Sequence, residues 1–223
     1  MTGWGEFALA FAAFLLTHSV PIRPPMRPVL VAWFGPRGFT FVYSVLSLGV
    51  LAWLIGAAGR APHVALWFWA PWQNRLTLVL MLGACLILAL SIGRPNPFSF
   101  GGAGDGRFDP ARPGIVRLVR HPLLLALALW AGAHLVPNGD LAHVLLFGVF
   151  ATFALMGGRL VDRRKQREMG TRWIELRKAV AAQPVMSKPA SWRELCLRIG
   201  AGVALYAALL QAHPWLFGVN PLS

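Results

Sequence analysis

Six apolar segments constrain the fold of this sequence more than any other feature. Hydrophobic residues make up 57% of the 223 residues and charged residues only 13%, whereas soluble domains carry about 25% charged residues. The apolar residues form continuous runs that approach the ~20 residues needed to cross the ~30 Å of a bilayer core as a helix. We therefore predict an all-α, polytopic membrane helix bundle, one domain over residues 1–223. Its six transmembrane helices are expected at roughly 4–20, 39–58, 76–92, 121–137, 141–160 and 195–217.

The distribution of basic residues predicts the orientation of these segments. Nineteen of the 21 Lys and Arg residues follow the first, third and fifth apolar segments. Since cytoplasmic loops of membrane proteins are enriched in Lys and Arg, we expect a bacterial inner-membrane protein with both termini in the periplasm. The net charge of +13 then reflects topology. We expect the lipid bilayer and no nucleic acid as a partner, because no aromatic-and-basic binding motif accompanies the charge.

Two connecting segments have patterns of their own. Met169, Trp173, Leu176 and Val180 recur at helical spacing, which predicts an amphipathic helix on the cytoplasmic lipid surface, either as an anchor or as a functional clamp. The segment 101–106 is rich in glycine, which is typical of a flexible loop. Its alternative role is to bring backbone N–H groups near an anion. The glycines concerned are Gly101, Gly102, Gly104 and Gly106.

Three histidines are the strongest candidates for a site. His18 and His134 lie near the ends of apolar segments, and His121 follows Arg120 where the fourth segment begins. A polar side chain in a span is costly and often functional, although a helix–helix hydrogen bond worth about 1 kcal/mol is the simpler alternative. Imidazole ligates haem iron, zinc and copper. An apolar helical bundle that offers imidazoles from two helices favours haem b, because no carboxylate lies deep in a span and no Cys–His cluster supports zinc.

Helix geometry limits which histidines can act together. His121 and His134 are thirteen residues apart, which is about 20 Å along one helix, so they cannot ligate the same iron. His18 is therefore required in any bis-histidine pair. The expected depth in the membrane favours pairing His18 with His121.

The sequence resembles the NnrU family, membrane proteins associated with denitrification, over most of its length. The matching motifs are Thr17-His18-Ser19 with Arg23, residues 113–122, residues 129–135 with 138–140, and Asp162-Arg163-Arg164. That family is similar to the plant zeta-carotene cis–trans isomerase, a membrane haem b protein. The resemblance implies that His18 and His134 hold the haem, with His121 as the alternative to His134. Ala131 stands where the isomerase has a cysteine proposed to exchange with the second histidine, so the resemblance does not extend to that ligand exchange.

A weaker resemblance is to the isoprenylcysteine carboxyl methyltransferases. It rests on Arg120-His121-Pro122 and on the segment 169–173, and it implies that Arg120 and His121 contact S-adenosylmethionine. The residues after Pro122 depart from that pattern.

From these patterns we expect a haem b protein that acts in denitrification-linked redox chemistry or as an isomerase-like enzyme. Its substrate would be a small apolar molecule such as a polyene or quinone. The alternatives are a membrane methyltransferase that uses S-adenosylmethionine and a non-catalytic assembly partner of nitrite or nitric oxide reductase.

Overall fold

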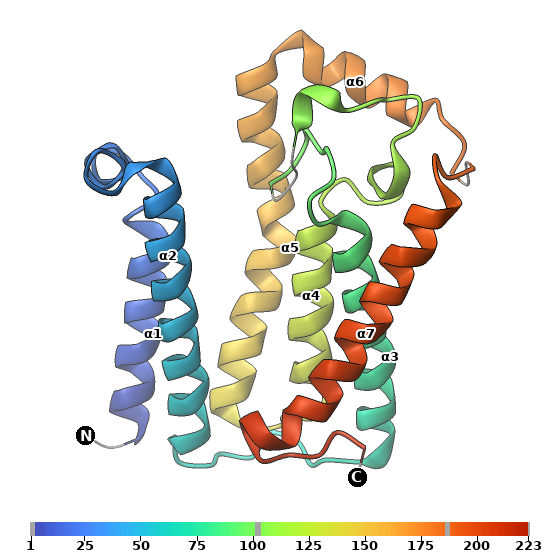
Figure 1. Ribbon diagram of the computed structural model, residues 1–223. Coiled ribbons are helices and arrows are strands. Elements are labelled where there is room, and N and C mark those ends of the chain that lie inside the picture. Colours follow the sequence, from blue (N-terminus) through green and yellow to red (C-terminus); the bar gives the residue numbers. More distant parts are fainter. Residues whose placement is uncertain (1–2, 101–103, 186–187, 223) are drawn as a thin grey trace. The chain divides into compact units, whose positions relative to one another are not determined.

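The computed structural model of the chain describes residues 3–100, 104–185 and 188–222 and folds most of them into helices (Figure 1). The helices are α1 (Gly3–Ser19), α2 (Met26–Arg60), α3 (Pro71–Ser91), α4 (Pro122–Leu135), α5 (Leu141–Met169), α6 (Thr171–Ala181) and α7 (Trp192–Phe217), with two short 3-10 turns, η1 (Asp105–Arg107) and η2 (Gly114–Arg117). The predicted all-α class is confirmed for the described residues.

Four of these helices, α2, α3, α5 and α7, are long and apolar enough to cross a membrane. Helix α4 is apolar but has 14 residues, and α1 has 17, at or below the length that spans the hydrocarbon core. Helix α2 is interrupted at Gly35, whose φ of 69° is not helical, and Pro36 follows at the start of its second part. The chain is thus a multi-pass membrane protein by length and composition, and the count of six spans stays a prediction.

The chain divides into two compact units, and each is described by itself. The first unit contains the residues up to Phe68 together with Gly139–Leu146. In it, α1 packs against α2, and the carboxylate of Glu6 accepts hydrogen bonds from Arg60 at 2.6 Å and from Trp53 at 3.2 Å. The buried apolar residues of this helix pair are Phe7, Ala10, Leu54, Ala57 and Ala58.

The second unit contains Trp69–Asn138 and the residues from Phe147 onward. Helix α3 packs against both α4 and α7. The contact with α7 is close at Gly202, where an added Cβ would lie 3.1 Å from the backbone of Leu86 and 3.2 Å from the side chain of Ala89. Small residues at such positions let membrane helices approach one another.

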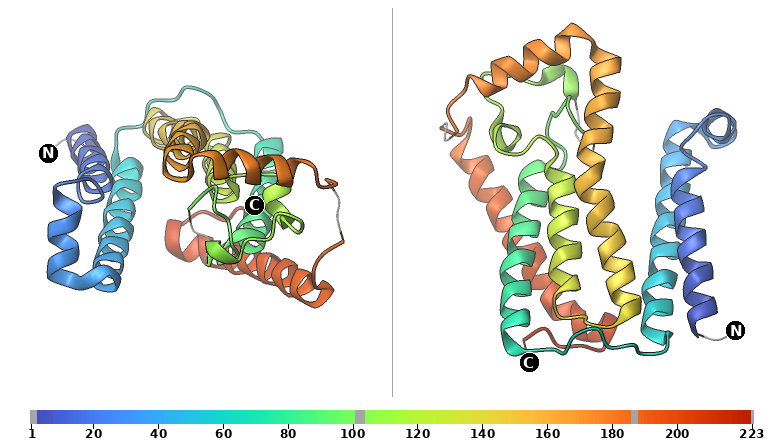
Figure 2. Two further views of the ribbon diagram at one scale, coloured as in Figure 1. Left: turned by 90° about the horizontal axis from the view of Figure 1, so that it is seen from above. Right: turned by 180° about the vertical axis from the view of Figure 1, so that it is seen from behind.

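Helix α6 lies across the end of the second unit where α3 ends and α4 begins (Figures 1 and 2). It is separated from α5 by Gly170, whose φ is +58°. Its apolar side packs within the protein, because Trp173 and Val180 are buried in a cluster with Phe98 and Val116. The predicted helix is therefore present, and its position on the lipid surface stays a prediction.

Candidate functional site

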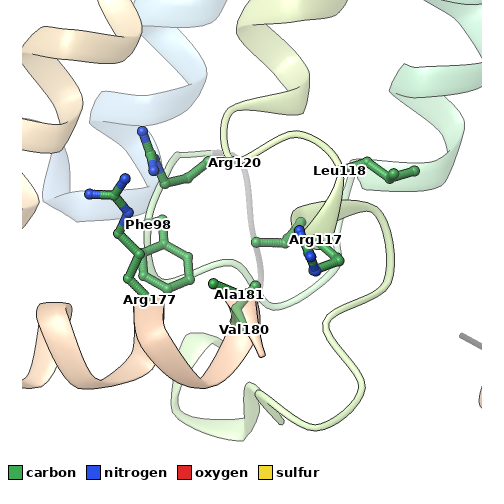
Figure 3. A pocket seen from close by; sticks show the side chains of 8 residues that line it. Phe98, Arg117, Leu118, Arg120, Arg177, Val180 and Ala181 are labelled. Carbon is green, nitrogen blue, oxygen red and sulfur yellow. The ribbon is translucent and has the colours of Figure 1, made fainter. Parts of the chain in front are cut away.

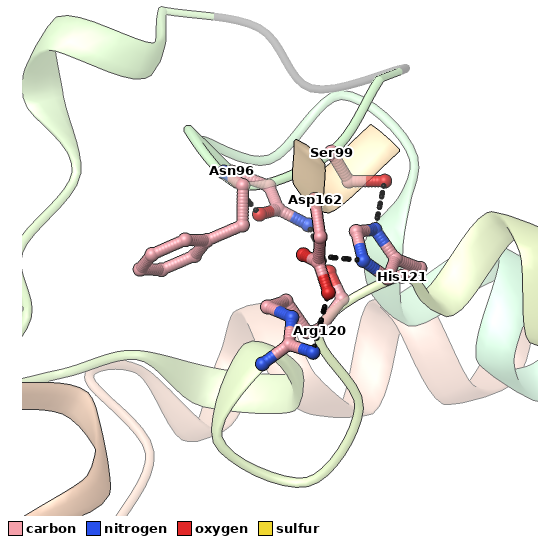
Figure 4. Close-up of polar contacts among 6 residues, drawn as sticks. Asn96, Ser99, Arg120, His121 and Asp162 are labelled. Carbon is pink, nitrogen blue, oxygen red and sulfur yellow. Dashed lines mark hydrogen bonds and ion pairs between the residues drawn. The ribbon is translucent and has the colours of Figure 1, made fainter. Parts of the chain in front are cut away.

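A polar network surrounds the start of α4, where Arg120 and His121 precede the first helical residue, Pro122 (Figure 4). Asp162, on α5, accepts a hydrogen bond from Arg120 Nη2 at 2.7 Å. Its second oxygen, Oδ1, lies 3.0 Å from His121 Nε2. One carboxylate thus joins two consecutive residues before α4 to the neighbouring helix.

The segment after α3 completes this network. Ser99 Oγ lies 3.1 Å from His121 Nδ1, and Asn96 donates its side-chain amide to the carbonyl of Arg120 at 3.1 Å. Asn96 also donates its backbone N–H to Asp105 at 2.9 Å. Asn96 and Ser99 are both buried. The network therefore ties the connecting loop to the start of α4 and to α5 through hydrogen bonds.

Electrostatics favour a neutral imidazole at His121. Burial lowers the pKa of His121 below its ordinary value, and the charge of Arg120 acts in the same direction, against the opposing effect of Asp162. In the neutral form that fits the contacts, Nε2–H donates to Asp162 and Nδ1 accepts from the hydroxyl of Ser99. Both ring nitrogens of His121 therefore have partners, and Arg120 already pairs with a carboxylate.

His134 lies at the opposite end of α4 and has a different arrangement. Its Nδ1 is 2.8 Å from the carbonyl oxygen of Trp130, so Nδ1 carries the proton and donates it. Nε2 is then the acceptor nitrogen, and it has no hydrogen-bond partner among the described residues of this unit. The rings of Trp130 and Phe147 lie 5.4 and 5.2 Å from the imidazole, centroid to centroid.

His213, on α7, lies beside His134 within the same unit. The two ring centroids are 6.3 Å apart and the ring planes differ by 23°. His213 Nδ1 is 2.8 Å from the carbonyl oxygen of Val219, to which it donates. His213 was not among the three histidines singled out from the sequence, and its place beside His134 follows from the packing of the helices.

His18 lies near the end of α1 in the first unit. Its Nδ1 is 2.8 Å from the carbonyl oxygen of Phe14, four residues earlier in the helix. His134 makes the same kind of contact with the carbonyl of Trp130. The ring stacks on Phe14 at a centroid distance of 3.9 Å, with Tyr43 at 6.0 Å. His18 and His134 belong to different units, so the structure does not establish a distance between them.

The donor chemistry at His18 and His134 fits haem iron. A haem needs only axial protein ligands, which neutral imidazole nitrogens supply. No group of three or more His, Cys, Asp or Glu side chains that could hold a metal ion occurs among the described residues. Of the glycine-rich loop, Gly101 and Gly102 lie outside the described residues, and Gly104 adopts a left-handed conformation with φ 68° before η1.

Sequence reasoning missed several members of the network. Asp162 belongs to a motif that supports the family resemblance, but the motif gives it no role. Asn96 and Ser99 lie in a loop whose prolines and glycines predict flexibility, although both side chains are buried. One sequence feature could have indicated that this loop is ordered: Asn96 lies between two prolines, Pro95 and Pro97, a pattern typical of a fixed turn.

Its apolar helices define the chain as an integral membrane protein of the all-α class. The sequence matches the family described as NnrU protein over residues 6–221, which is nearly the whole chain. The chain therefore belongs to the NnrU family. No curated protein and no solved structure matches it.

Proposed function

We propose that this protein binds haem b within the membrane and that His134 is an axial ligand of the iron. The observation that carries the proposal is the hydrogen bond from His134 Nδ1 to the Trp130 carbonyl. Such a bond fixes the tautomer, orients the ring and leaves Nε2 as the ligating nitrogen, as in metal sites whose histidines donate their other N–H to a carbonyl. The surrounding aromatic rings provide an apolar environment for a macrocycle.

Two histidines are candidates for the second axial ligand. The family resemblance supports His18, which shares the arrangement of His134. The structure adds His213, whose ring centroid lies 6.3 Å from that of His134. A pair without His18, which the expectation from sequence had required, is therefore a second candidate. His121 is less suited, since Asp162 and Ser99 occupy both of its nitrogens.

The proposed role is electron transfer linked to denitrification in a bacterial inner membrane. When bound, haem would supply one-electron redox chemistry, and His134 with either His18 or His213 would hold it. Ala131, one turn before His134, is fully buried and has no atom that ligates iron. This residue argues against an isomerase that exchanges its axial ligand, although a polyene or quinone remains a suitable apolar partner.

Single-histidine variants test the choice of ligands. The protein is purified in detergent from haem-replete cells, and bound haem b is quantified by its pyridine haemochrome spectrum. We expect His134→Ala to lose haem, and one of His18→Ala and His213→Ala to lose it or become high-spin. His63→Ala, an exposed histidine, is the control and should keep the spectrum of the unmodified protein. Loss of haem in His121→Ala alone would contradict this ligand assignment.

A further inference from the structure

Three arginines line a pocket beneath α6 that the proposed haem site does not use (Figure 3). The pocket has a volume of about 290 Å³ and lies between the segment before α4 and the end of α6. Arg117 and Arg120 come from the segment before α4, and Arg177 comes from α6. None of the described residues that line the pocket is an Asp or Glu.

The three guanidinium groups are held in place by contacts that leave hydrogen-bond donors available. Arg117 donates Nε to the carbonyl of Gln183 at 2.7 Å. Arg120 and Arg177 lie 5.9 and 5.2 Å from the ring of Trp173, measured from the guanidinium carbon to the ring centroid. Arg177 is thereby positioned by a cation–π contact, without an ion pair to any described residue.

Arg120 supplies a further sign that an acceptor belongs here. Its Nη2 pairs with Asp162, but its Nε is buried and has no hydrogen-bond partner among the described residues. Buried donors are rarely left without an acceptor. With one carboxylate against three guanidinium groups, the pocket has a surplus of positive charge.

We propose that this pocket binds a phosphate group. Guanidinium groups bind phosphate with paired, charge-assisted hydrogen bonds, and three arginines from two elements line this pocket. The volume is at the small end of the range for ligand pockets, about 300–1,000 Å³, and suits a phosphate headgroup better than a whole nucleotide. Leu118, which lines the pocket and is 63% exposed, gives the opening an apolar side.

The phosphate has two possible sources, the headgroup of an anionic phospholipid and a small soluble phosphate. The pocket is lined by Phe98, which follows α3, and by residues just before α4. Anionic lipid headgroups lie near the ends of apolar helices and are attracted by basic residues there. Phosphatidic acid and glycerol 3-phosphate carry the same phosphate monoester with and without acyl chains, so they separate the two sources. Phosphatidylcholine, whose phosphate is a zwitterionic diester, is the control lipid.

Binding of each probe to the full-length protein in detergent is measured by thermophoresis. We expect saturable binding of phosphatidic acid that Arg177→Gln and Arg117→Gln each weaken at least about tenfold, the loss expected for one charge-assisted bond. Arg172→Gln removes the same charge from α6 at an exposed residue outside the lining and should leave the Kd nearly unchanged. Two lining variants are used so that a folding defect in one leaves the other informative.

The outcomes separate the alternatives. Weak binding of glycerol 3-phosphate beside tight binding of phosphatidic acid identifies a lipid headgroup as the occupant, and comparable binding identifies a soluble phosphate. An equal loss in Arg172→Gln would overturn the proposal in favour of diffuse surface charge. Absence of saturable binding by both phosphate monoesters, or equally tight binding of phosphatidylcholine, would also overturn it.

Discussion

His121 Nε2 lies 3.0 Å from Oδ1 of Asp162, so the residue that caps α4 is bonded to the neighbouring helix α5. The same carboxylate binds Arg120 at 2.7 Å. This arrangement gives both residues of the Arg-His pair a structural role at the start of α4. Arg120 and His121 thus differ from His134, whose acceptor nitrogen Nε2 remains available.

The first prediction concerns the carboxylate of this network. Asp162→Asn removes the ion pair with Arg120 and one hydrogen-bond acceptor of His121, and we expect it to lower the free energy of unfolding by roughly 1–3 kcal/mol. The measurement is unfolding by SDS in mixed micelles. Glu168→Gln, which breaks an exposed pair with Arg164 on the same helix, is the control and should have little effect. Equal losses in both variants would contradict a specific role for Asp162.

The second prediction is a pH dependence of stability. Because burial lowers the pKa of folded His121, the unfolded chain takes up a proton below about pH 6.5 that the folded chain resists. Stability should therefore be highest above that pH and fall as the pH decreases toward 5. His121→Gln, whose amide can still donate to Asp162, should flatten this part of the profile of thermal midpoints. An unchanged slope in the variant would show that other groups cause the pH dependence.

The third prediction concerns the close contact between α3 and α7. Gly202→Leu places a side chain against Leu86, where a single added carbon already lies 3.1 Å from the backbone, and should cost roughly 1–3 kcal/mol through overpacking. Gly200→Leu is the matched control, because nothing lies within 4 Å of the Cβ position there. Comparison of their thermal midpoints measures the difference, and similar midpoints would contradict the packing.

The helices could be predicted from sequence because their apolar runs are long and their ends carry turn residues. The fourth segment illustrates this. Pro122 is the first residue of α4, and Asn138, which follows the end of the helix, donates a hydrogen bond to the carbonyl of His134. The expected span beginning at residue 39 corresponds to the second part of α2. The helical residues before it were missed, because basic residues and prolines there resemble a loop.

The polar network and the arginine pocket could not be predicted, because they depend on tertiary contacts between distant segments. Asp162 lies 41 residues from His121 along the chain, and no periodicity relates them. The apolar spacing in α6 predicted a helix on the lipid surface, but a hydrophobic stripe fits a lipid surface and a protein surface equally well. In the structure Trp173 and Val180 pack in a cluster with Phe98, and the position of α6 on the lipid surface stays a prediction.

The fourth prediction concerns orientation in the membrane. Alkaline phosphatase, which is active only outside the cytoplasm, is fused after Asp140 and after Ala181. The charge bias of the loops predicts activity at Asp140 and none at Ala181. The reverse pattern would invert the topology and place the arginine pocket on the periplasmic side.

The central claim is that His134 ligates a haem b iron, and the optical spectrum of the purified protein tests it most directly. We expect a stoichiometric haem with a sharp Soret band and the split visible bands of a six-coordinate, low-spin centre on reduction. His134→Ala should abolish this spectrum, whereas His63→Ala should retain it. Protein from haem-replete cells without Soret absorbance, or a His134→Ala variant with an unchanged spectrum, would contradict the claim.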